Sequence, residues 1–568
     1  MSKISFRSYL IFLFLPTLLI IIHHHHHHRR NNNDNDNDDD NASTDLSLST
    51  NSRWIVDDRN NGERVKLSCV SWVSHLEVAV AEGLSKQPVD AISKMIVEMG
   101  FNCVRLTYPL FLFTDDKLGS MTMRQSLQKW GLFGTVAGVQ VNNPSLVDLS
   151  LVNVFQEIVS NLNNNNVMVI LDNHLSKPGW CCNENDDDGF FGDLYFDPEV
   201  WIEGICRVAS MFKGYTNVVG MSLRNELRGH KQNLNDWYKY MQKGAERVHA
   251  ANPNVLVILS GLNYDLDLSF LRTNPISVSF SRKLVFEIHW YGFSDGDDWI
   301  TGNLNEVCGR VIDRLTSNAL FLLDQGYPLF MSEWGVDQTG TNENDNRYLN
   351  CLMGWAAEHD IDWALWTIVG SYYYREGVSG WDETYGLLNW DWRGPRSSSF
   401  LKKISPLQSP FQALGSSSTS EHKILFHPST GLCMHNHSLS LGPCSNAMAL
   451  DYTLEKTLIL KGTNYCLQAN ALHKPVKLDT ACHADSSSKW EAISASKMHL
   501  SSKTKNDTIV CLDIDTNNII VTNICKCLSR EYLCDPSSQW FKIINSTSFN
   551  LAPPIIDLIN VQHNSYLL

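Results

Sequence analysis

The sequence predicts an α/β chain that consists of a (β/α)8 barrel followed by a smaller all-β domain. Residues 51–405 contain eight short apolar runs at wide intervals, and most are followed by a stretch with helical periodicity. Residues 421–547 contain three similar cysteine-bearing units. Residues 406–420 between them are rich in Pro, Gly and Ser, a composition typical of a linker. The length of 568 residues also exceeds what one compact core usually contains.

The apolar runs have the character of buried parallel strands, since they are short, continuous and not alternating. They lie at 65–70, 103–106, 167–171, 218–223, 255–259, 284–288, 328–331 and 363–366. The clearest helical stretches lie at 198–212, 234–250, 146–162 and 348–359. Eight such strands in about 350 residues favour a closed barrel over an open doubly wound sheet. No glycine-rich phosphate-binding sequence follows an early run, which counts against a nucleotide site.

Composition narrows the environment and the partners. The net charge of −15 excludes general attraction to nucleic acid or to an anionic membrane surface. Basic residues followed by an apolar run predict a signal peptide over residues 1–22, and an uncleaved anchor remains an alternative. Residues 23–50 form a low-complexity His, Asn and Asp segment, either natural or a tag, and residues 548–568 form a tail. Together with 15 cysteines this predicts a secreted, disulfide-bonded protein, with Asn-X-Ser/Thr glycosylation acceptors at Asn41, Asn436, Asn506 and Asn545.

Polar and aromatic residues stand at the ends of the apolar runs. In a barrel these positions converge on one mouth. They are Arg105, His174, Asn225, Glu226, His289, Tyr291, Glu333 and Trp366. Two carboxylates facing each other across such a mouth are what glycosidic cleavage requires, one protonated and one ionised. The set therefore predicts a glycosidase, although each residue alone is typical of an ordinary strand exit.

The motifs around these positions resemble glycoside hydrolase family 5, the family of many cellulases and mannanases. The resemblance spans about residues 55–400 and rests on Leu223-Arg224-Asn225-Glu226, His289-Trp290-Tyr291, Ser332-Glu333-Trp334-Gly335, Phe101-Asn102-Cys103-Val104-Arg105-Leu106 and Leu171-Asp172-Asn173-His174. Trp366 matches the tryptophan of the eighth strand. Leu227 and Ser332 depart from the common pattern, which has Pro and Gly at these positions.

The resemblance implies a role for each site residue. Glu226 is the expected general acid/base and Glu333 the nucleophile of a retaining double displacement. Asn225 is expected to bind the sugar 2-hydroxyl, and Arg105 and Tyr291 to orient Glu333. His174 and His289 are expected to hydrogen-bond to the sugar or to the acid. Trp366 is expected to form a platform beneath the sugar.

The expected substrate is a β-1,4-linked polysaccharide, cellulose or a β-glucan, with β-mannan as the alternative. No cofactor and no metal are expected, and the protein is expected to be a monomer. A non-catalytic carbohydrate-binding protein on an inactive barrel is the competing interpretation. Six further aromatic residues are candidates for either sugar contact or core packing: Trp180, Trp290, Trp334, Tyr372, Tyr373 and Trp381.

The C-terminal repeat resembles the ricin-B-type β-trefoil, a lectin fold. Its units begin at Leu432-Cys433-Met434, Tyr465-Cys466-Leu467 and Val510-Cys511-Leu512, and the expected cysteine partners within units are Cys444, Cys482 and either Cys525 or Cys527. The units end in Tyr452, Trp490 and Trp540, where the Gln-x-Trp signature of the fold is degenerate. Both sugar binding and a purely structural role remain open for this domain.

An acidic loop lies between the third and fourth strands. Glu184, Asp186 and Asp188 have the opening spacing of a calcium loop, but Tyr195 stands where a bidentate glutamate is needed. The loop is therefore predicted to be a solvated active-site loop. Cys181 and Cys182 precede it, and the seven cysteines of the barrel segment leave at least one unpaired or paired elsewhere.

Overall fold

The computed structural model describes residues 46–414, 420–435, 439–482, 486–529 and 534–547. The predicted signal peptide, the low-complexity segment up to residue 45, the C-terminal tail, and the acceptors Asn41 and Asn436 lie outside the described residues. Among the described helices, none has the length and apolar character needed to cross a membrane.

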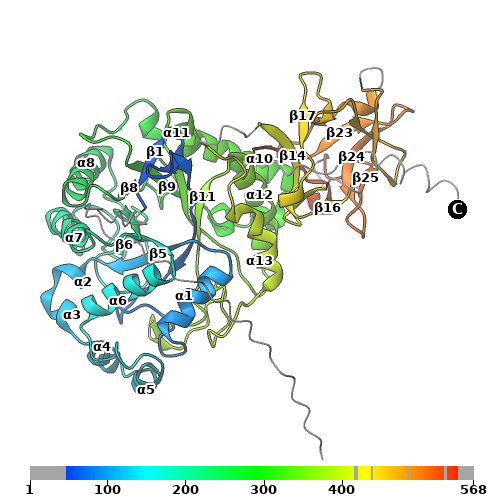
Figure 1. The fold of residues 1–568 in the computed structure, drawn as a ribbon. Coiled ribbons are helices and arrows are strands. Elements are labelled where there is room, and N and C mark those ends of the chain that lie inside the picture. The colour runs from blue at the N-terminus through cyan, green and yellow to red at the C-terminus, as the bar shows by residue number, and fades with distance from the viewer. Residues whose placement is uncertain (1–45, 415–419, 436–438, 483–485, 530–533, 548–568) are drawn as a thin grey trace, which may run out of the picture. The chain divides into compact units, whose positions relative to one another are not determined.

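The larger part of the described chain is built on a closed barrel of eight parallel strands (Figure 1). Each strand pairs with the next along the chain, and the last pairs with the first, so the predicted (β/α)8 barrel is confirmed. The strands are β4 (Ser68–Trp72), β5 (Cys103–Pro109), β6 (Met168–Leu175), β7 (Val218–Ser222), β8 (Leu256–Leu259), β9 (Leu284–His289), β10 (Leu329–Trp334) and β11 (Asp362–Leu365). All eight predicted runs overlap these strands.

Helices cover the outside of the barrel (Figure 1). They are α1 (Val89–Glu98), α2 (Phe111–Thr114), α3 (Asp116–Ser120), α4 (Met123–Lys129), α5 (Phe133–Asn142), α6 (Leu151–Asn164), α7 (Pro198–Met211), α8 (Leu234–Ala251), α9 (Asp298–Thr301), α10 (Leu304–Leu315), α11 (Phe321–Asp324), α12 (Glu343–His359) and α13 (Ser398–Ile404). The predicted first residues of two helices, 146 and 348, are wrong because the residues that cap these helices lie elsewhere. Ser150 caps α6 and Asn342 caps α12, each accepting a hydrogen bond from a backbone N–H of the first turn.

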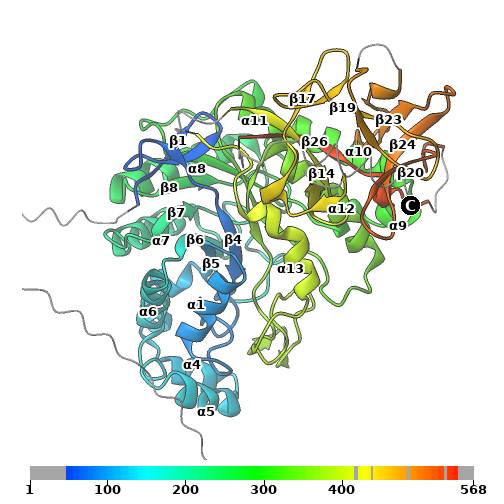
Figure 2. The same ribbon diagram turned by 45° about the vertical axis from the view of Figure 1, so that its right-hand side comes forward.

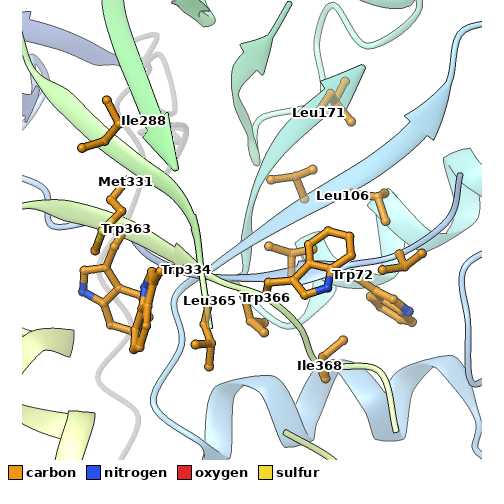
Figure 3. Packing of buried hydrophobic residues seen from close by; sticks show 14 of the residues in the cluster. Trp72, Leu106, Leu171, Ile288, Met331, Trp334, Trp363, Leu365, Trp366 and Ile368 are labelled. Atoms are coloured by element: carbon orange, nitrogen blue, oxygen red, sulfur yellow. The ribbon is translucent and has the colours of Figure 1, made fainter. Parts of the chain in front are cut away.

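Side chains alternate along each barrel strand, so neighbouring residues of one strand pack in two different hydrophobic cores. Val104 and Leu106 of β5 belong to the outer core between the strands and the helices, together with the tryptophans and aliphatic residues of Figure 3. Cys103 belongs to the inner core, which fills the barrel itself. Because side chains alternate along a strand, Arg105 points into the barrel. The fold therefore buries a cation beneath the mouth.

A small antiparallel sheet precedes the barrel and contributes to the inner core. Its strands are β1 (Leu48–Asn51), β2 (Trp54–Asp57) and β3 (Glu63–Arg64). Leu48 and Ile55 are buried in the same cluster as the barrel interior. The ordered structure of this part of the chain thus starts before residue 51, the boundary expected from the sequence.

The C-terminal region is all-β, as predicted, with two antiparallel sheets (Figure 2). One contains β14 (His422–His427), β15 (Leu432–Met434), β16 (Leu441–Gly442), β17 (Leu450–Tyr452), β18 (Leu458–Leu460), β19 (Cys466–Gln468), β21 (Lys477–Asp479) and β26 (Lys542–Ser546). The other contains β20 (Lys474–Pro475), β22 (Glu491–Ala492), β23 (Leu500–Lys503), β24 (Ile509–Ile514) and β25 (Ile520–Asn523). Trp490 and Trp540 are fully buried, which makes these two unit-ending aromatics core residues.

The disulfides follow the division of the cysteines along the chain. Cys69–Cys103 joins β4 to β5, Cys308–Cys351 joins α10 to α12, and the adjacent Cys181 and Cys182 are bonded to each other. The C-terminal bonds are Cys433–Cys444, Cys466–Cys482, Cys511–Cys525 and Cys527–Cys534. Cys206 is the unpaired cysteine of the described chain, which agrees with the odd count in the barrel segment.

The first part of the expected linker is packed rather than free. Leu407 and Phe411 are buried in the outer core. The backbone N–H groups of Phe411 and Gln412 donate to Asp360 Oδ2 at 3.0 and 2.9 Å. Composition suggested a linker here, but two apolar side chains and one buried carboxylate hold the segment against the barrel.

Candidate active site

Seven of the eight predicted site residues lie at or just after the C-terminal ends of barrel strands, and Arg105, within β5, reaches two of them from inside the barrel. Six of them line a cavity of about 970 Å³: His174, Glu226, His289, Tyr291, Glu333 and Trp366. Arg105 and Asn225 are fully buried beneath these residues. The sequence therefore identified a set of side chains that the fold brings together.

The carboxylate of Glu333, at the end of β10, is held by two donors. Arg105 Nη1 donates to Glu333 Oε1 at 2.5 Å, and the Tyr291 hydroxyl donates to Oε2 at 3.0 Å. Burial raises the pKa of Glu333, while His289, when it is protonated, and the Arg105 guanidinium act to lower it. The two hydrogen bonds fix the carboxylate in one orientation and favour its ionised form.

Arg105 is also the centre of a buried network. Its Nη2 lies 3.0 Å from Asp172 Oδ1 and donates to Asn225 Oδ1 at 2.7 Å. Asp172 Oδ2 lies 2.7 Å from His174 Nδ1, which fixes the imidazole at the end of β6. His174 in turn stacks on Trp366, with ring centroids 5.4 Å apart. One guanidinium thus connects four of the strand ends.

Glu226 follows β7 and faces His289. His289 Nδ1 lies 2.8 Å from Glu226 Oε1, and the backbone N–H of Glu226 donates to Asp265 Oδ2 at 3.1 Å. The backbone φ of Glu226 is +43°, which is uncommon for a residue with a Cβ and is typical of constrained functional positions. Burial raises the pKa of Glu226 to about 7, against the opposing charges of Arg228 and Arg105. A carboxyl group with this pKa exchanges its proton near neutrality.

The two carboxylates are close neighbours across the mouth. One oxygen of Glu226 and one of Glu333 lie within 4.8 Å of each other, with a nitrogen of His289 within the same distance of both. Retaining glycosidases place their carboxyl groups ~5–5.5 Å apart, whereas inverting enzymes leave ~6.5–9.5 Å for a water molecule. The approach of the two carboxylates is therefore nearer to the separation found in retaining enzymes than to that of inverting enzymes.

Several buried polar residues of the site were missed by sequence reasoning. Asp172 and Asp265 contact the predicted residues directly, Glu287 accepts from Ser222 Oγ at 2.5 Å, and His75 stacks on His174 with centroids 3.9 Å apart. Glu287 lies inside a predicted strand and Asp172 directly follows one, and a charged residue at such a position is the signal of an inward-facing site residue. His75 and Asp265 lie in loops and carry no such signal.

Two carboxylates of the acidic loop pair with arginines, whereas Asn183, Glu184, Asn185 and Asp187 are exposed to solvent. Asp188 accepts from Arg224 Nη2 at 2.8 Å, and Asp186 pairs with Arg228. Asp188 also accepts from the backbone N–H groups of Ser176 and Lys177. The predicted active-site loop is therefore adjacent to the site and partly solvated, and Asp186 and Asp188 are the carboxylates that anchor it.

The six candidate aromatics separate by position. Trp180 and Trp381 line the cavity, and Trp381 is 40% exposed. Trp290 and Trp334 are fully buried in the outer core. Tyr372 and Tyr373 are also buried, and their hydroxyl groups bond to Glu383 and Ala81 O. Arg375 lies over the Trp180 ring at 3.3 Å and extends this aromatic side of the cavity.

Comparison with known proteins agrees with this geometry. The sequence pattern of the family described as Cellulase (glycosyl hydrolase family 5) matches residues 56–371. The chain belongs to glycosyl hydrolase family 5. A glycosyl hydrolase 5 family protein of Chamaecyparis obtusa is 41% identical over 524 residues, which are 89% of this chain and 94% of the relative. The major extracellular endoglucanase of Xanthomonas campestris pv. campestris is 26% identical over 61% of this chain and 68% of its own length.

Solved structures share the barrel of this family 5 chain. A hyperthermophilic endocellulase of Pyrococcus horikoshii has a TM-score of 0.51 at 19% identity, and covers 64% of this chain and 99% of its own. A variant of that endocellulase solved with cellotetraose has a TM-score of 0.52 at 19% identity, with coverage of 64% and 99%. At this identity the likeness establishes the fold.

Proposed function

We propose that this family 5 enzyme is a retaining endo-β-glucanase in which Glu333 is the nucleophile and Glu226 the acid/base. The observation that carries the proposal is the approach of the two carboxylates to within 4.8 Å in a cavity at the barrel mouth. Their surroundings differ in the required sense. Glu333 receives two donated hydrogen bonds, whereas Glu226 has a pKa of about 7 and can hold a proton.

In the first step, Glu333 attacks the anomeric carbon and forms a glycosyl ester. Glu226 gives its proton to the glycosidic oxygen, so the leaving chain departs as an alcohol. In the second step, Glu226 takes a proton from water, and the water oxygen displaces Glu333. Two inversions restore the starting configuration. The short separation of the carboxylates supports this route.

The other site residues support these two carboxylates. Arg105 and Tyr291 donate hydrogen bonds to Glu333 that favour its ionised form, and His289 contacts Glu226 at 2.8 Å. Asn225 is proposed to bind the 2-hydroxyl of the sugar, a contact that strengthens in the transition state. His174 and Trp366 form a stacked pair at the cavity wall and would contact the sugar ring. The proposed chemistry needs no metal or cofactor.

A β-1,4-glucan is the proposed substrate. Relatives named as endoglucanases and a related barrel solved with cellotetraose support this choice over β-mannan. Trp180 and Trp381 give the cavity aromatic faces of the kind that pack against sugar rings.

The domain organisation that we propose has a catalytic barrel within 51–405, a short connection within 406–420 and a ricin-B-type β-trefoil within 421–547. Three disulfides within the repeated units and two buried unit-ending tryptophans support the trefoil. Secretion through residues 1–22 is proposed with it, supported by seven disulfides and by a relative named as extracellular. We further propose that the protein acts as a monomer.

The proposal is tested with a panel of soluble β-glucan, cellulose and β-mannan, comparing the native chain with Glu226→Gln and Glu333→Gln. We expect the native enzyme to shorten β-glucan internally and both variants to lose this activity. The matched control is Glu203→Gln, because Glu203 lies on the exposed side of α7. Undiminished hydrolysis by Glu333→Gln would overturn the assignment, and faster hydrolysis of mannan would overturn the substrate choice.

A further inference from the structure

The vicinal disulfide Cys181–Cys182 has no role in the chemistry described above, yet it lies in the cavity. Both cysteines line the cavity beside His174, Trp180 and Glu226. Of the six other disulfides, none includes a residue that lines this cavity. Its position raises the question of which neighbour it serves.

That neighbour is the amide of Asn225. Asn225 Nδ2 lies 3.7 Å from Cys181 Sγ and 3.6 Å from Cys182 Sγ, so the NH2 group is directed at the two bonded sulfur atoms. Asn225 Oδ1 accepts from Arg105, which has donors only. The amide cannot be turned over without placing its NH2 group against the guanidinium. Arg105 and the disulfide therefore hold the two ends of one fully buried amide.

The residues after the disulfide are anchored to the same strand exit. Arg224, directly before Asn225, donates to Asp188 Oδ1, and Arg228 Nε donates to Asn183 O at 3.1 Å. The strand exit thus contacts the 181–188 segment before, at and after Asn225. These contacts place the sulfurs at a fixed position beside the amide.

We propose that the Cys181–Cys182 disulfide is a positioning element that fixes the orientation of the Asn225 amide. The proposal rests on the function proposed above. The bond holds both sulfurs in one place, where they act as weak acceptors and as a wall against the amide. Two separate thiols or hydroxyls would rotate independently and leave the NH2 group without a fixed neighbour. An amide displaced from its productive orientation weakens its transition-state contact, so the rate falls more than ground-state binding.

The test is a double-mutant cycle on the full-length enzyme with its best hydrolysed substrate. We expect Cys181→Ser/Cys182→Ser to lower kcat roughly tenfold with little change in KM. Asn225→Ala should lower kcat further, and the triple variant should be no slower than Asn225→Ala alone. Multiplicative effects, or an unchanged kcat in the double-serine variant, would overturn the proposal.

Two controls separate positioning from general damage. Cys308→Ser/Cys351→Ser removes a buried disulfide outside the cavity, and its effect on kcat should multiply with that of Asn225→Ala. Cys206→Ser removes the unpaired thiol on α7 and should leave kcat unchanged. Melting temperatures of all variants report whether the fold is retained.

A second route does not depend on the serine variants folding. Dithiothreitol reduces a disulfide by exchange, so both cysteines become thiols and the reagent becomes a cyclic disulfide. We expect a thiol-alkylating reagent to label Cys181 and Cys182 in step with the fall in kcat of the native enzyme. The kcat of the Asn225→Ala variant should not fall further under the same reduction. Equal loss in both proteins would overturn the proposal.

The experiment also distinguishes this proposal from the proposed function. If mannan is the better substrate, the choice of glucan fails while the same cycle is run on mannan. If no polysaccharide is cleaved, the proposed function is wrong, and the positioning role, which rests on it, is wrong with it. If a polysaccharide is cleaved, coupling of kcat between Asn225 and the disulfide supports the positioning role, whereas independent effects contradict that role alone.

Discussion

Arg105 Nη1 donates a 2.5 Å hydrogen bond to Glu333 Oε1, and this pair connects β5 to β10 inside the barrel. The Arg105 side chain is 0% exposed and that of Glu333 is 6% exposed. An ion pair this deeply buried is costly to break, because the partner left behind is an unpaired charge. The contact therefore serves both the fold and the proposed nucleophile.

Replacing Arg105 by Met should affect activity and stability together. The positive charge acts to lower the pKa of Glu333, so its removal raises that pKa and reduces the ionised fraction at acidic pH. The acidic limb of the kcat/KM profile should move to higher pH, and unfolding should become easier by about 3–5 kcal/mol. Arg105→Lys is the matched variant and should retain part of both. An acidic limb that stays in place would contradict the role of Arg105.

We expect the ionisation of Glu226 to set the basic limb of the kcat/KM profile against pH. Its pKa is raised to about 7, so the proton required by the leaving oxygen is lost as the pH rises through about 7. We expect kcat/KM for an unactivated β-glucan oligosaccharide to fall above that pH. Glu226→Gln should keep appreciable activity only on a substrate with an acidic phenol leaving group, without this basic limb. A basic limb that persists in the variant would exclude Glu226 as its source.

The same raised pKa makes a prediction about stability. A carboxyl group whose pKa is higher in the folded than in the unfolded state favours folding below about pH 4.5, and this contribution is lost as the pH rises through about 7. The raised pKa corresponds to about 3 kcal/mol. Glu226→Gln should therefore gain in melting temperature relative to the native enzyme between pH 5 and pH 8. A difference independent of pH would contradict the pKa.

Exposed tryptophans inside and outside the cavity offer a matched pair. Trp381 lines the cavity and is 40% exposed, whereas Trp390 is 48% exposed and lies outside it. Trp381→Ala should raise the KM for a glucan chain about fivefold, equivalent to the loss of about 1 kcal/mol of contact. Trp390→Ala should leave KM close to the native value. Equal effects of the two changes would argue against a sugar contact at Trp381.

Asn305 on α10 hydrogen-bonds to the C-terminal region. We therefore expect the barrel and the C-terminal region to stabilise each other through it. Its Oδ1 accepts from Trp540 Nε1 and Ser496 Oγ, each at 2.9 Å, and its Nδ2 donates to Cys527 O at 3.1 Å. Asn305→Ala leaves these buried groups unpaired at roughly 1–3 kcal/mol each. We expect a lower melting temperature with kcat retained. Asn346→Ala, at an exposed position, is the control, and an equal melting temperature for both variants would show that the contact contributes little.

Much of the barrel could be predicted because its strands carry their own signal. Buried parallel strands are continuous apolar runs, and the runs at 218–223 and 284–288 nearly coincide with β7 and β9. Site residues such as Glu333 could be predicted because they terminate such runs. The fixed geometry of a barrel then brings residues that are distant in sequence to one mouth.

What sequence reasoning missed depends on contacts between distant loops. Asp265 accepts a hydrogen bond from the backbone N–H of Glu226, but neither the spacing nor the hydrophobic periodicity of the sequence predicts that contact. The packed state of residues 407–412 likewise follows from Asp360, which is distant in sequence. Helix starts were missed where a polar cap lay several residues from the first apolar residue, as at Asn342. Local composition describes a segment, whereas these features arise from its partners.

The most direct test of the central claim is to trap the glycosyl ester. A 2-deoxy-2-fluoro cellobioside with a good leaving group slows hydrolysis of the intermediate more than its formation, and mass spectrometry of the digested enzyme locates the attached sugar. We expect one added 2-deoxy-2-fluorocellobiosyl group, a disaccharide, on the peptide that contains Glu333, and no label in Glu333→Gln. A label on Glu226, or time-dependent turnover with α-configured first product and no label, would contradict it.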